Sequence, residues 1–279
     1  MNPMKSRLLV TLTLFQLAIT LGFGKTGEAV WAHQASDIPP DARLHFGQLE
    51  NGFRYVTMQH KDPPERVSIR LYVAAGSLQE ADEQRGLAHF LEHMAFNGTR
   101  NYKGTEIIEF LQRLGMAFGP DINAHTSFDE TVYKLDLPDV KEETIDQGLT
   151  IMRDWADGML LDKEEIDKER GVILKEKLGR DSIRFRLMEA EINFLFPDSR
   201  LPHRIPIGLE QVIQEAPRER FVDFYQTHYN PQNMILVVVG DIDQAAIEAK
   251  VKAQFGEMKR HPKVAPALDM GKLTAAGLR

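Results

Sequence analysis

Residues 67–99 read VSIRLYVAAGSLQEADEQRGLAHFLEHMAFNGT and carry the strongest structural signal in the chain. Over 67–73, apolar side chains alternate with polar or amphipathic ones, which predicts a strand with one buried face. Gly76-Ser77 ends this strand, and the pattern over 86–96 predicts a helix that stops at Asn97-Gly98. The stretch therefore predicts a strand, a tight turn and a short helix in close succession.

Strand and helix patterns continue to alternate along the rest of the chain. Runs of strand length lie at 53–58, 131–137 and 234–239. The last run is almost wholly apolar, which predicts a strand buried on both faces. Helical patterns lie at 105–114, 143–159, 219–227 and 244–255, and in a long helix that starts at Asp162 and runs towards the loop of Pro197, Pro202 and Pro206. This mixture favours an α+β fold over a doubly wound parallel sheet.

The composition excludes several kinds of protein. The chain has 279 residues and no Cys, so it has no disulfides, no Cys-ligated zinc, no iron–sulfur cluster and no thiol nucleophile. A transition-metal site must therefore use His and carboxylates. The net charge of −7 argues against a nucleic-acid binder, which would need a basic face. We therefore expect no nucleic-acid partner.

The N-terminal segment has the pattern of a secretory signal peptide. Lys5 and Arg7 precede an apolar run over 8–23, and Val30-Trp31-Ala32 offers small residues at a cleavage position. We therefore expect residues 1–32 to be a signal peptide and the protein to be exported. The alternative is an uncleaved N-terminal anchor, which would be the protein's attachment to a membrane.

The predicted helix over 86–96 contains an H-x-x-E-H motif. His89 and His93 are four residues apart, so both imidazoles project from one face and can meet a single zinc ion. Glu92 lies on the same side of the helix and can hold a metal-bound water without being a ligand. This is the inverted form of a zinc-protease motif. The simpler alternative is a helix with two surface histidines and a salt-bridging glutamate.

A catalytic zinc site needs a third protein ligand, and the long helix from Asp162 offers candidates. Glu169 and Glu176 are seven residues apart and lie on one stripe of that helix. Gly171 between them predicts close packing against another backbone, because a helical Gly is otherwise unfavourable. The spacing alone does not choose between the two carboxylates, and a solvated acidic face would also explain them.

At this point the residues resemble a known family. The chain is similar to the pitrilysin/insulinase family of zinc peptidases, which includes the mitochondrial processing peptidase and bacterial periplasmic members. The resemblance rests on GLAHFLEHMAFNGT at 86–99, NAHTS at 123–127, DETVY at 129–133, ERGVILKE at 169–176, RIPIG at 204–208 and the stretch from Tyr229 to Asp241. These stretches span nearly the whole of the chain after the signal segment.

The resemblance implies a role for each matching residue. His89, His93 and Glu176 would be the ligands of one Zn²⁺ ion, and Glu92 would be the general base. Glu169 would support the site from outside the ligand set and tune proton transfer. Asn123 and Ala124 match an edge strand that pairs with the substrate backbone. The implied fold is a two-layer α+β sandwich, with a mostly antiparallel sheet and helices packed on one face.

The implied function is a zinc-dependent endopeptidase that cleaves extended peptides or small proteins, with a zinc-bound water as nucleophile. Residues 33–279 would form a single peptidase unit, with the zinc-bearing part at 33–200 and the start of the following family segment, in truncated form, at 201–279. A second homologous domain or subunit would complete the enzyme, most naturally in the periplasm, although a secreted protein is also compatible with export. The alternatives are a non-catalytic peptide-binding or assembly subunit, or an inactive fragment without its partner half.

Overall fold

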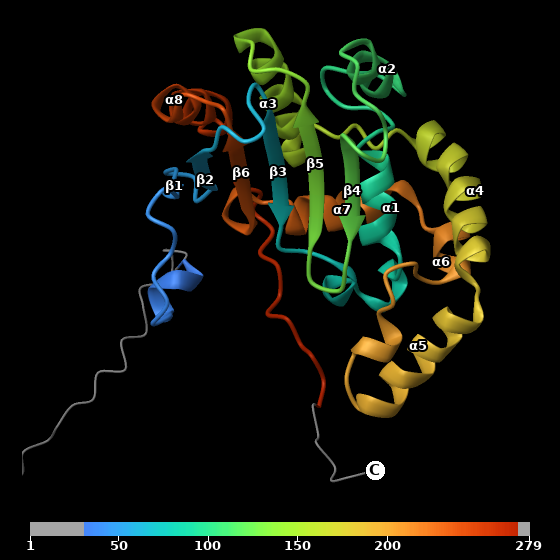
Figure 1. Cartoon of the computed structure of the whole chain (residues 1–279). Helices are drawn as coiled ribbons and strands as arrows, with labels where there is room; N and C mark the ends of the chain where they lie inside the picture. Colours follow the sequence, from blue (N-terminus) through green and yellow to red (C-terminus); the bar gives the residue numbers. More distant parts are fainter. Residues whose placement is uncertain (1–30, 273–279) are drawn as a thin grey trace, which may run out of the picture.

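A six-stranded sheet forms the centre of the computed structural model, which describes residues 31–272 (Figure 1). The strands are β1 (His45–Gln48), β2 (Arg54–Gln59), β3 (Val67–Val73), β4 (Ile122–Thr126), β5 (Thr131–Leu137) and β6 (Met234–Gly240). Their spatial order is β1-β2-β6-β3-β5-β4, which leaves β4 at one edge. The β2–β6 pair is parallel, and the other pairs between these strands are antiparallel.

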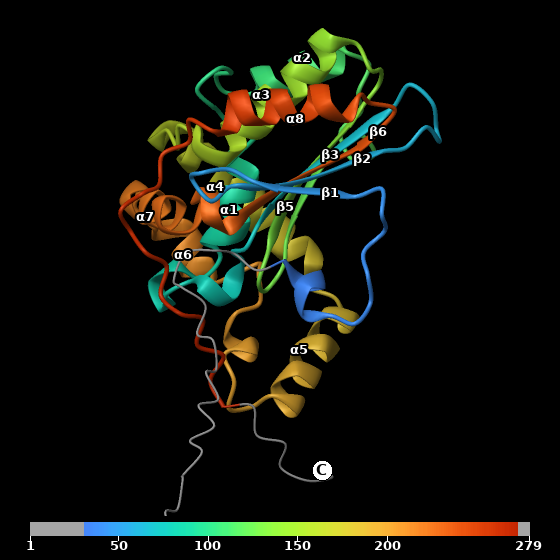
Figure 2. The same cartoon turned by 90° about the vertical axis from the view of Figure 1, so that its left-hand side faces the viewer.

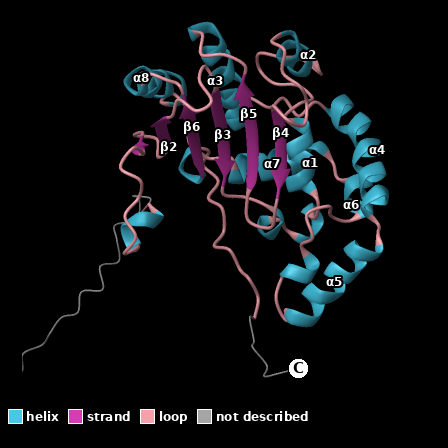
Figure 3. Cartoon of the chain, in the orientation of Figure 1, coloured by secondary structure: helices cyan, strands magenta, loops and turns pink. Residues whose placement is uncertain are grey.

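Helices cover one face of the sheet or lie beyond its edge at β4. They are α1 (Leu87–Met94), α2 (Glu106–Arg113), α3 (Glu142–Asp157), α4 (Lys163–Arg180), α5 (Ile183–Leu195), α6 (Glu210–Glu215), α7 (Arg218–His228) and α8 (Gln244–Phe255). Figure 2 shows the sheet nearly edge-on, with α1, α3, α7 and α8 on one side of it. The prediction of a mostly antiparallel sheet with helices on one face is confirmed (Figure 3). Within residues 31–272, no helix combines the length and the apolar character that crossing a membrane requires.

Strand β3 follows the alternation predicted from its sequence. Ile69 and Leu71 are 0% exposed, while Ser68, Arg70 and Tyr72 are only partly buried on the other face. Leu71 pairs with Tyr133 of β5 on one side and with Leu236 of β6 on the other. The buried side chains of three neighbouring strands therefore meet beneath the helices and form one core.

The prediction that β6 is buried on both faces is wrong. Leu236 and Val238 are 0% exposed, but Ile235, Val237 and Val239 are only partly buried. The second set lies on the face opposite α1, α3, α7 and α8, where the register places it beside Arg54 and Arg70. β6 also lies between β2 and β3, so the segment after residue 200 supplies a central strand of the same sheet.

The long helix predicted from Asp162 is two helices. It is interrupted at Asp181 and Ser182, which have extended backbones, and the Ser182 hydroxyl caps α5 by accepting a hydrogen bond from the Phe185 amide. α5 buries none of its residues. Ile183, Leu187 and Phe194 share one face of α5 and are 72%, 64% and 56% exposed. α5 therefore presents an apolar stripe to its surroundings.

Residues 1–30 of the predicted signal peptide lie outside the described residues. The last two positions of that prediction are described, and the short 3-10 helix Ala32–Ala35 begins there. The Trp31 ring lies edge-on to Phe46 of β1 with centroids 5.0 Å apart, and the Arg54 guanidinium lies 5.4 Å from the Trp31 ring. β1 itself was not predicted, and neither was α6.

Candidate metal centre

The helix that carries the H-x-x-E-H motif is held at both ends by buried groups. At its start, Oε1 of Glu80 accepts hydrogen bonds from the amides of Gly86, at 3.0 Å, and Ala88, at 2.9 Å. Just beyond its end, the Trp155 indole donates a 2.8 Å hydrogen bond to the carbonyl of Ala95. A carboxyl oxygen at a helix N-terminus accepts hydrogen bonds from amides that have no partner within the helix. These contacts fix the direction in which α1 projects its histidines.

A second segment crosses the start of α1 at very short range. Gly208 has a φ of +71°, and a Cβ at this position would lie 2.2 Å from the Cα of Gly86. The Arg204 guanidinium donates to the carbonyl of Glu80 at 3.2 Å, and Lys177 of α4 donates to the carbonyl of Gly208 at 2.7 Å. The RIPIG stretch therefore ties α1 to α4, which supplies the carboxylates of the site.

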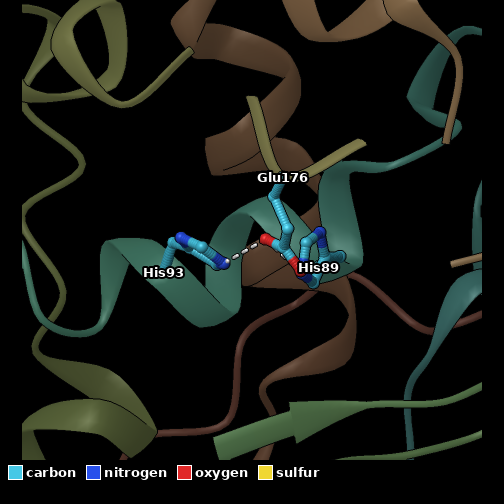
Figure 4. A group of neighbouring side chains, drawn as sticks. All are labelled: His89, His93 and Glu176. Carbon is cyan, nitrogen blue, oxygen red and sulfur yellow. Dashed lines mark ion pairs between the residues drawn. The ribbon is translucent and has the colours of Figure 1, made fainter. Parts of the chain in front are cut away.

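His89, His93 and Glu176 form the one group of metal-ligand type found in residues 31–272 (Figure 4). Oε2 of Glu176 lies 3.5 Å from Nε2 of His89 and 3.3 Å from Nε2 of His93. The ligand atoms of the three residues all lie within 4.8 Å of one another. Two imidazole nitrogens and one carboxylate oxygen are the donor set of a catalytic zinc site with an open fourth position, so these residues fit a zinc ion.

Glu169 lies outside this group. Its Oε1 is 2.8 Å from Nδ1 of His93, and its Oε2 accepts a 2.8 Å hydrogen bond from the side-chain Nδ2 of Asn97. Glu169 therefore contacts the ring nitrogen of His93 that faces away from Glu176. A carboxylate in this position fixes the tautomer and orientation of a metal-binding histidine. The geometry distinguishes the two glutamates that sequence spacing left equivalent.

The charges in the group are strongly coupled. Burial lowers the pKa of His93, but its hydrogen bonds with Glu169 and Glu176 outweigh burial and raise that pKa to about 9. The hydrogen bonds from His89 and His93 hold the pKa of Glu176 well below its ordinary value. A metal ion must displace the proton on the imidazole it binds, so metal binding here competes with protons.

Glu92 lies beside this group and is 9% exposed. The hydroxyl of Thr126 on β4 donates a 2.7 Å hydrogen bond to its Oε2. Glu92, the three metal-ligand candidates and Thr126 line one cavity of about 630 Å³. The remaining wall includes apolar side chains, among them Phe96, Phe118 and Val172. The cavity thus places a potential proton acceptor next to a potential metal site, with room for a ligand.

The edge strand β4 forms another wall of the cavity through Asn123 and Ala124. The Asn123 side chain is exposed, and its Oδ1 accepts a 2.9 Å hydrogen bond from the Ala124 amide. β4 pairs with β5 on one side, and its other side is a sheet edge beyond Ile122, which forms an isolated bridge with Phe118. An extended chain can add to such an edge.

Three residues of the site were missed by the sequence reasoning: Asn97, Thr126 and Arg180. Arg180 follows Glu176 by four positions on α4, which is the spacing that brings side chains together on a helix, whereas Asn97 lies three residues beyond the end of α1. Thr126 follows Ala124 by two and so shares its face of β4. The signals were present, but none of them carries a chemical signature of its own.

The packing predicted at Gly171 is wrong. Gly171 is exposed, and a Cβ built there would meet nothing within 4 Å. The close approach of two backbones at this site instead involves Gly86 and Gly208, at the start of α1. A glycine in a helix is therefore weak evidence of a helix crossing.

Two models of one protein family match most of the described chain. Residues 55–182 match the model "Insulinase (Peptidase family M16)", and residues 216–275 match "Peptidase M16 inactive domain". The chain is 39% identical over 224 residues to the probable zinc protease PqqL of Escherichia coli, which covers 80% of this chain and 24% of the relative. It is 31% identical over 226 residues to the chloroplastic stromal processing peptidase of Arabidopsis thaliana, covering 79% of this chain and 17% of that protein.

Solved structures agree with these sequence matches. The first half of the periplasmic protease PqqL from Escherichia coli superposes with a TM-score of 0.80 at 37% identity, covering 84% of this chain and 50% of that one. The ferredoxin protease FusC, in complex with Arabidopsis ferredoxin, superposes with a TM-score of 0.76 at 31% identity, covering 81% and 25%. The chain thus spans about a quarter of the length of PqqL. From its fold, its matches and its relatives, the chain belongs to the insulinase family of metallopeptidases, peptidase family M16.

Proposed function

We propose that this chain is the metal-bearing unit of a zinc-dependent endopeptidase that cleaves extended peptides or small unfolded proteins. The observation that carries the proposal is the convergence of His89 Nε2, His93 Nε2 and Glu176 Oε2, with Glu92 in the same cavity. Zinc held by these three residues would activate a water molecule and polarise the scissile carbonyl. The names of the relatives, which include zinc proteases, support the same chemistry.

Glu92 would be the general base. It is ionisable, largely buried and outside the proposed ligand set, which suits a group that takes a proton from water and returns it to the leaving amine. The Thr126 hydroxyl holds one carboxylate oxygen, so the other remains available for the proton. Glu169 would hold His93 in place through Nδ1 and so act indirectly.

The substrate would bind as an added strand at β4. Asn123 and Ala124 lie at that edge and line the cavity, so a backbone paired there would pass the proposed zinc position. The Ala124 amide is already bonded to Oδ1 of Asn123. Pairing at this amide would therefore require the Asn123 side chain to move aside.

The unit would work with a second homologous domain or subunit in an exported protein. PqqL is about four times longer than the matched segment, and the chain matches half of a PqqL structure that is itself the first half of that protease. The exposed apolar stripe on α5 supports contact with another folded body. The periplasmic location of PqqL and the signal-like N-terminus support export to the periplasm.

A comparison of the wild-type chain with Glu92→Gln tests the proposal. We expect both proteins to bind one equivalent of zinc, measured by mass spectrometry of metals after dialysis. With an internally quenched, unstructured peptide, the wild type should cleave slowly without its partner unit. Cleavage should fall by at least about a hundredfold in Glu92→Gln, because a general base contributes a factor of that order, and it should stop in 1,10-phenanthroline.

Two results would overturn the proposal. A wild-type chain that binds no zinc would remove the metal site. A zinc-loaded wild type that binds the peptide but cleaves it no faster than Glu92→Gln would instead favour a non-catalytic peptide-binding or assembly subunit, or an inactive fragment without its partner half.

A further inference from the structure

We propose that Arg180 is a positioning residue of the metal centre, which holds Glu176 so that a single carboxylate oxygen faces the metal. This inference rests on the proposed zinc site and adds a residue to it. Arg180 is the last residue of α4, and its guanidinium donates a hydrogen bond to Oε1 of Glu176. The other oxygen, Oε2, is the one that faces both histidines.

The two oxygens of Glu176 therefore have different partners. A carboxylate with two free oxygens can rotate about its last torsion, which is a soft sp³–sp² bond, and can offer either oxygen or both to a metal. With Oε1 bound to Arg180, rotation breaks an ion pair. The pair thus selects the orientation that presents Oε2 and leaves room for water and a substrate carbonyl, as a catalytic zinc site requires.

The position of Arg180 favours this role over that of an ordinary surface ion pair. α4 contains another i,i+4 pair, Lys163 with Asp167, whose side chains are 76% and 43% exposed and which does not line the cavity. Arg180 is 49% exposed and lines the same cavity as His89, His93 and Glu176. A partly exposed pair of this kind contributes little to helix stability. Removing Arg180 should therefore change zinc affinity more than it changes the stability of the fold.

A planar guanidinium suits this task better than an ammonium group. Arg can address a carboxylate oxygen in a fixed plane, whereas Lys offers a point charge on a flexible stem. Replacement by Lys should therefore preserve the charge but only part of the positioning. Residues that hydrogen-bond a metal ligand typically contribute a factor of about 10 to 100 to metal affinity.

The test is the zinc dissociation constant of four versions of the 279-residue chain, measured by competition with a chromophoric chelator: wild type, Arg180→Gln, Arg180→Lys and Lys163→Gln. Lys163→Gln is the matched control, because it removes one positive charge and one i,i+4 pair from the same helix. We expect the dissociation constant to rise about tenfold or more in Arg180→Gln, to rise less in Arg180→Lys, and to be unchanged in Lys163→Gln. Thermal unfolding of the metal-free proteins should be alike in all four.

The outcomes separate this inference from the function on which it rests. A wild type that binds no zinc would reject the metal site itself. If the wild type binds one zinc and the dissociation constant of Arg180→Gln is within threefold of the wild-type value, the proposed role of Arg180 is wrong. The same conclusion would follow if Arg180→Gln raised only KM for a peptide, since Arg180 would then contact substrate and not position a ligand. A weaker affinity matched by Lys163→Gln would also reject it, because the effect would come from charge alone.

Discussion

The Thr126 hydroxyl on the edge strand β4 donates a 2.7 Å hydrogen bond to Oε2 of Glu92 on α1. This bond joins the two elements that the proposed reaction needs: the strand edge where a peptide can pair, and the helix that carries the candidate base. Thr126 is partly buried and Glu92 is 9% exposed, so water competes weakly for the bond. The position of the base is therefore coupled to the position of the substrate strand.

Replacing Thr126 by Val should slow peptide cleavage about ten- to a hundredfold, because a hydrogen bond to a carboxylate contributes about 1.5–3 kcal/mol. Zinc content should not change. The measurement is kcat on an unstructured quenched peptide, with Thr126→Ser as the control that keeps the hydroxyl. If Thr126→Val and Thr126→Ser were equally active, the bond would have no part in the reaction.

The two glutamates of α4 should differ in their effect on zinc. Glu176→Gln should lose zinc on dialysis, whereas Glu169→Gln should keep it with an affinity about 10 to 100 times lower, since Glu169 contacts only the far nitrogen of His93. Competition with a chelator measures the zinc affinity of both variants. The reverse order would identify Glu169 as the ligand.

These glutamates also show how far the sequence could predict the site. The pairing of His89 with His93 follows from helix geometry alone, since residues four apart share a face. Glu169 and Glu176 share a stripe as well, so spacing could not choose between them, and the choice came from the family resemblance. What separates them in the structure is the position of α4 along α1, which depends on tertiary contacts such as Lys177 with the carbonyl of Gly208.

Gly171→Ala should raise the free energy of unfolding by up to about 1 kcal/mol, because Gly is unfavourable inside a helix and an added methyl group here meets no other atom. Gly208→Ala is the contrasting variant. Its Cβ would collide with the backbone of Gly86, and its φ is positive, so we expect a loss of about 2 kcal/mol or more. Urea denaturation measures both. A destabilised Gly171→Ala protein would show that α4 does pack closely at this point.

The fold was predicted best where the local pattern agrees with the final packing. β3 alternates in sequence and in burial, so its prediction was correct. β6 is apolar throughout, yet the helices lie on one face of the sheet, so Ile235, Val237 and Val239 are only partly covered. β1 has four residues, which are too few to show a clear period. The break between α4 and α5 depends on the Ser182 cap, which is evident only in the folded chain.

His228 should make the protein less stable in mild acid. Burial lowers its pKa from 6.5 to about 4, with Asp223 partly opposing the shift. Between pH 6.5 and 4, His228 therefore binds a proton in the unfolded chain but not in the folded chain. The contribution of neutral His228 to the free energy of unfolding is thus present above pH 6.5 and is lost as the pH falls towards 4. We expect a loss of about 2 kcal/mol between pH 7 and pH 5 from this group.

Urea denaturation of the metal-free protein at both pH values checks this expectation, with His228→Gln as the comparison. The variant should lose less stability than the wild type over the same interval. Equal losses would mean that His228 does not titrate in this way.

X-ray absorption at the zinc K edge, on the chain loaded with one equivalent of zinc, tests the proposed metal centre most directly. The expected first shell contains nitrogen and oxygen at about 2.0–2.1 Å, with outer-shell scattering from two imidazoles. That imidazole signal should fall in His93→Ala. A spectrum without imidazole scattering, or one that is the same in wild type and His93→Ala, would contradict the assignment of His89, His93 and Glu176 as the zinc ligands.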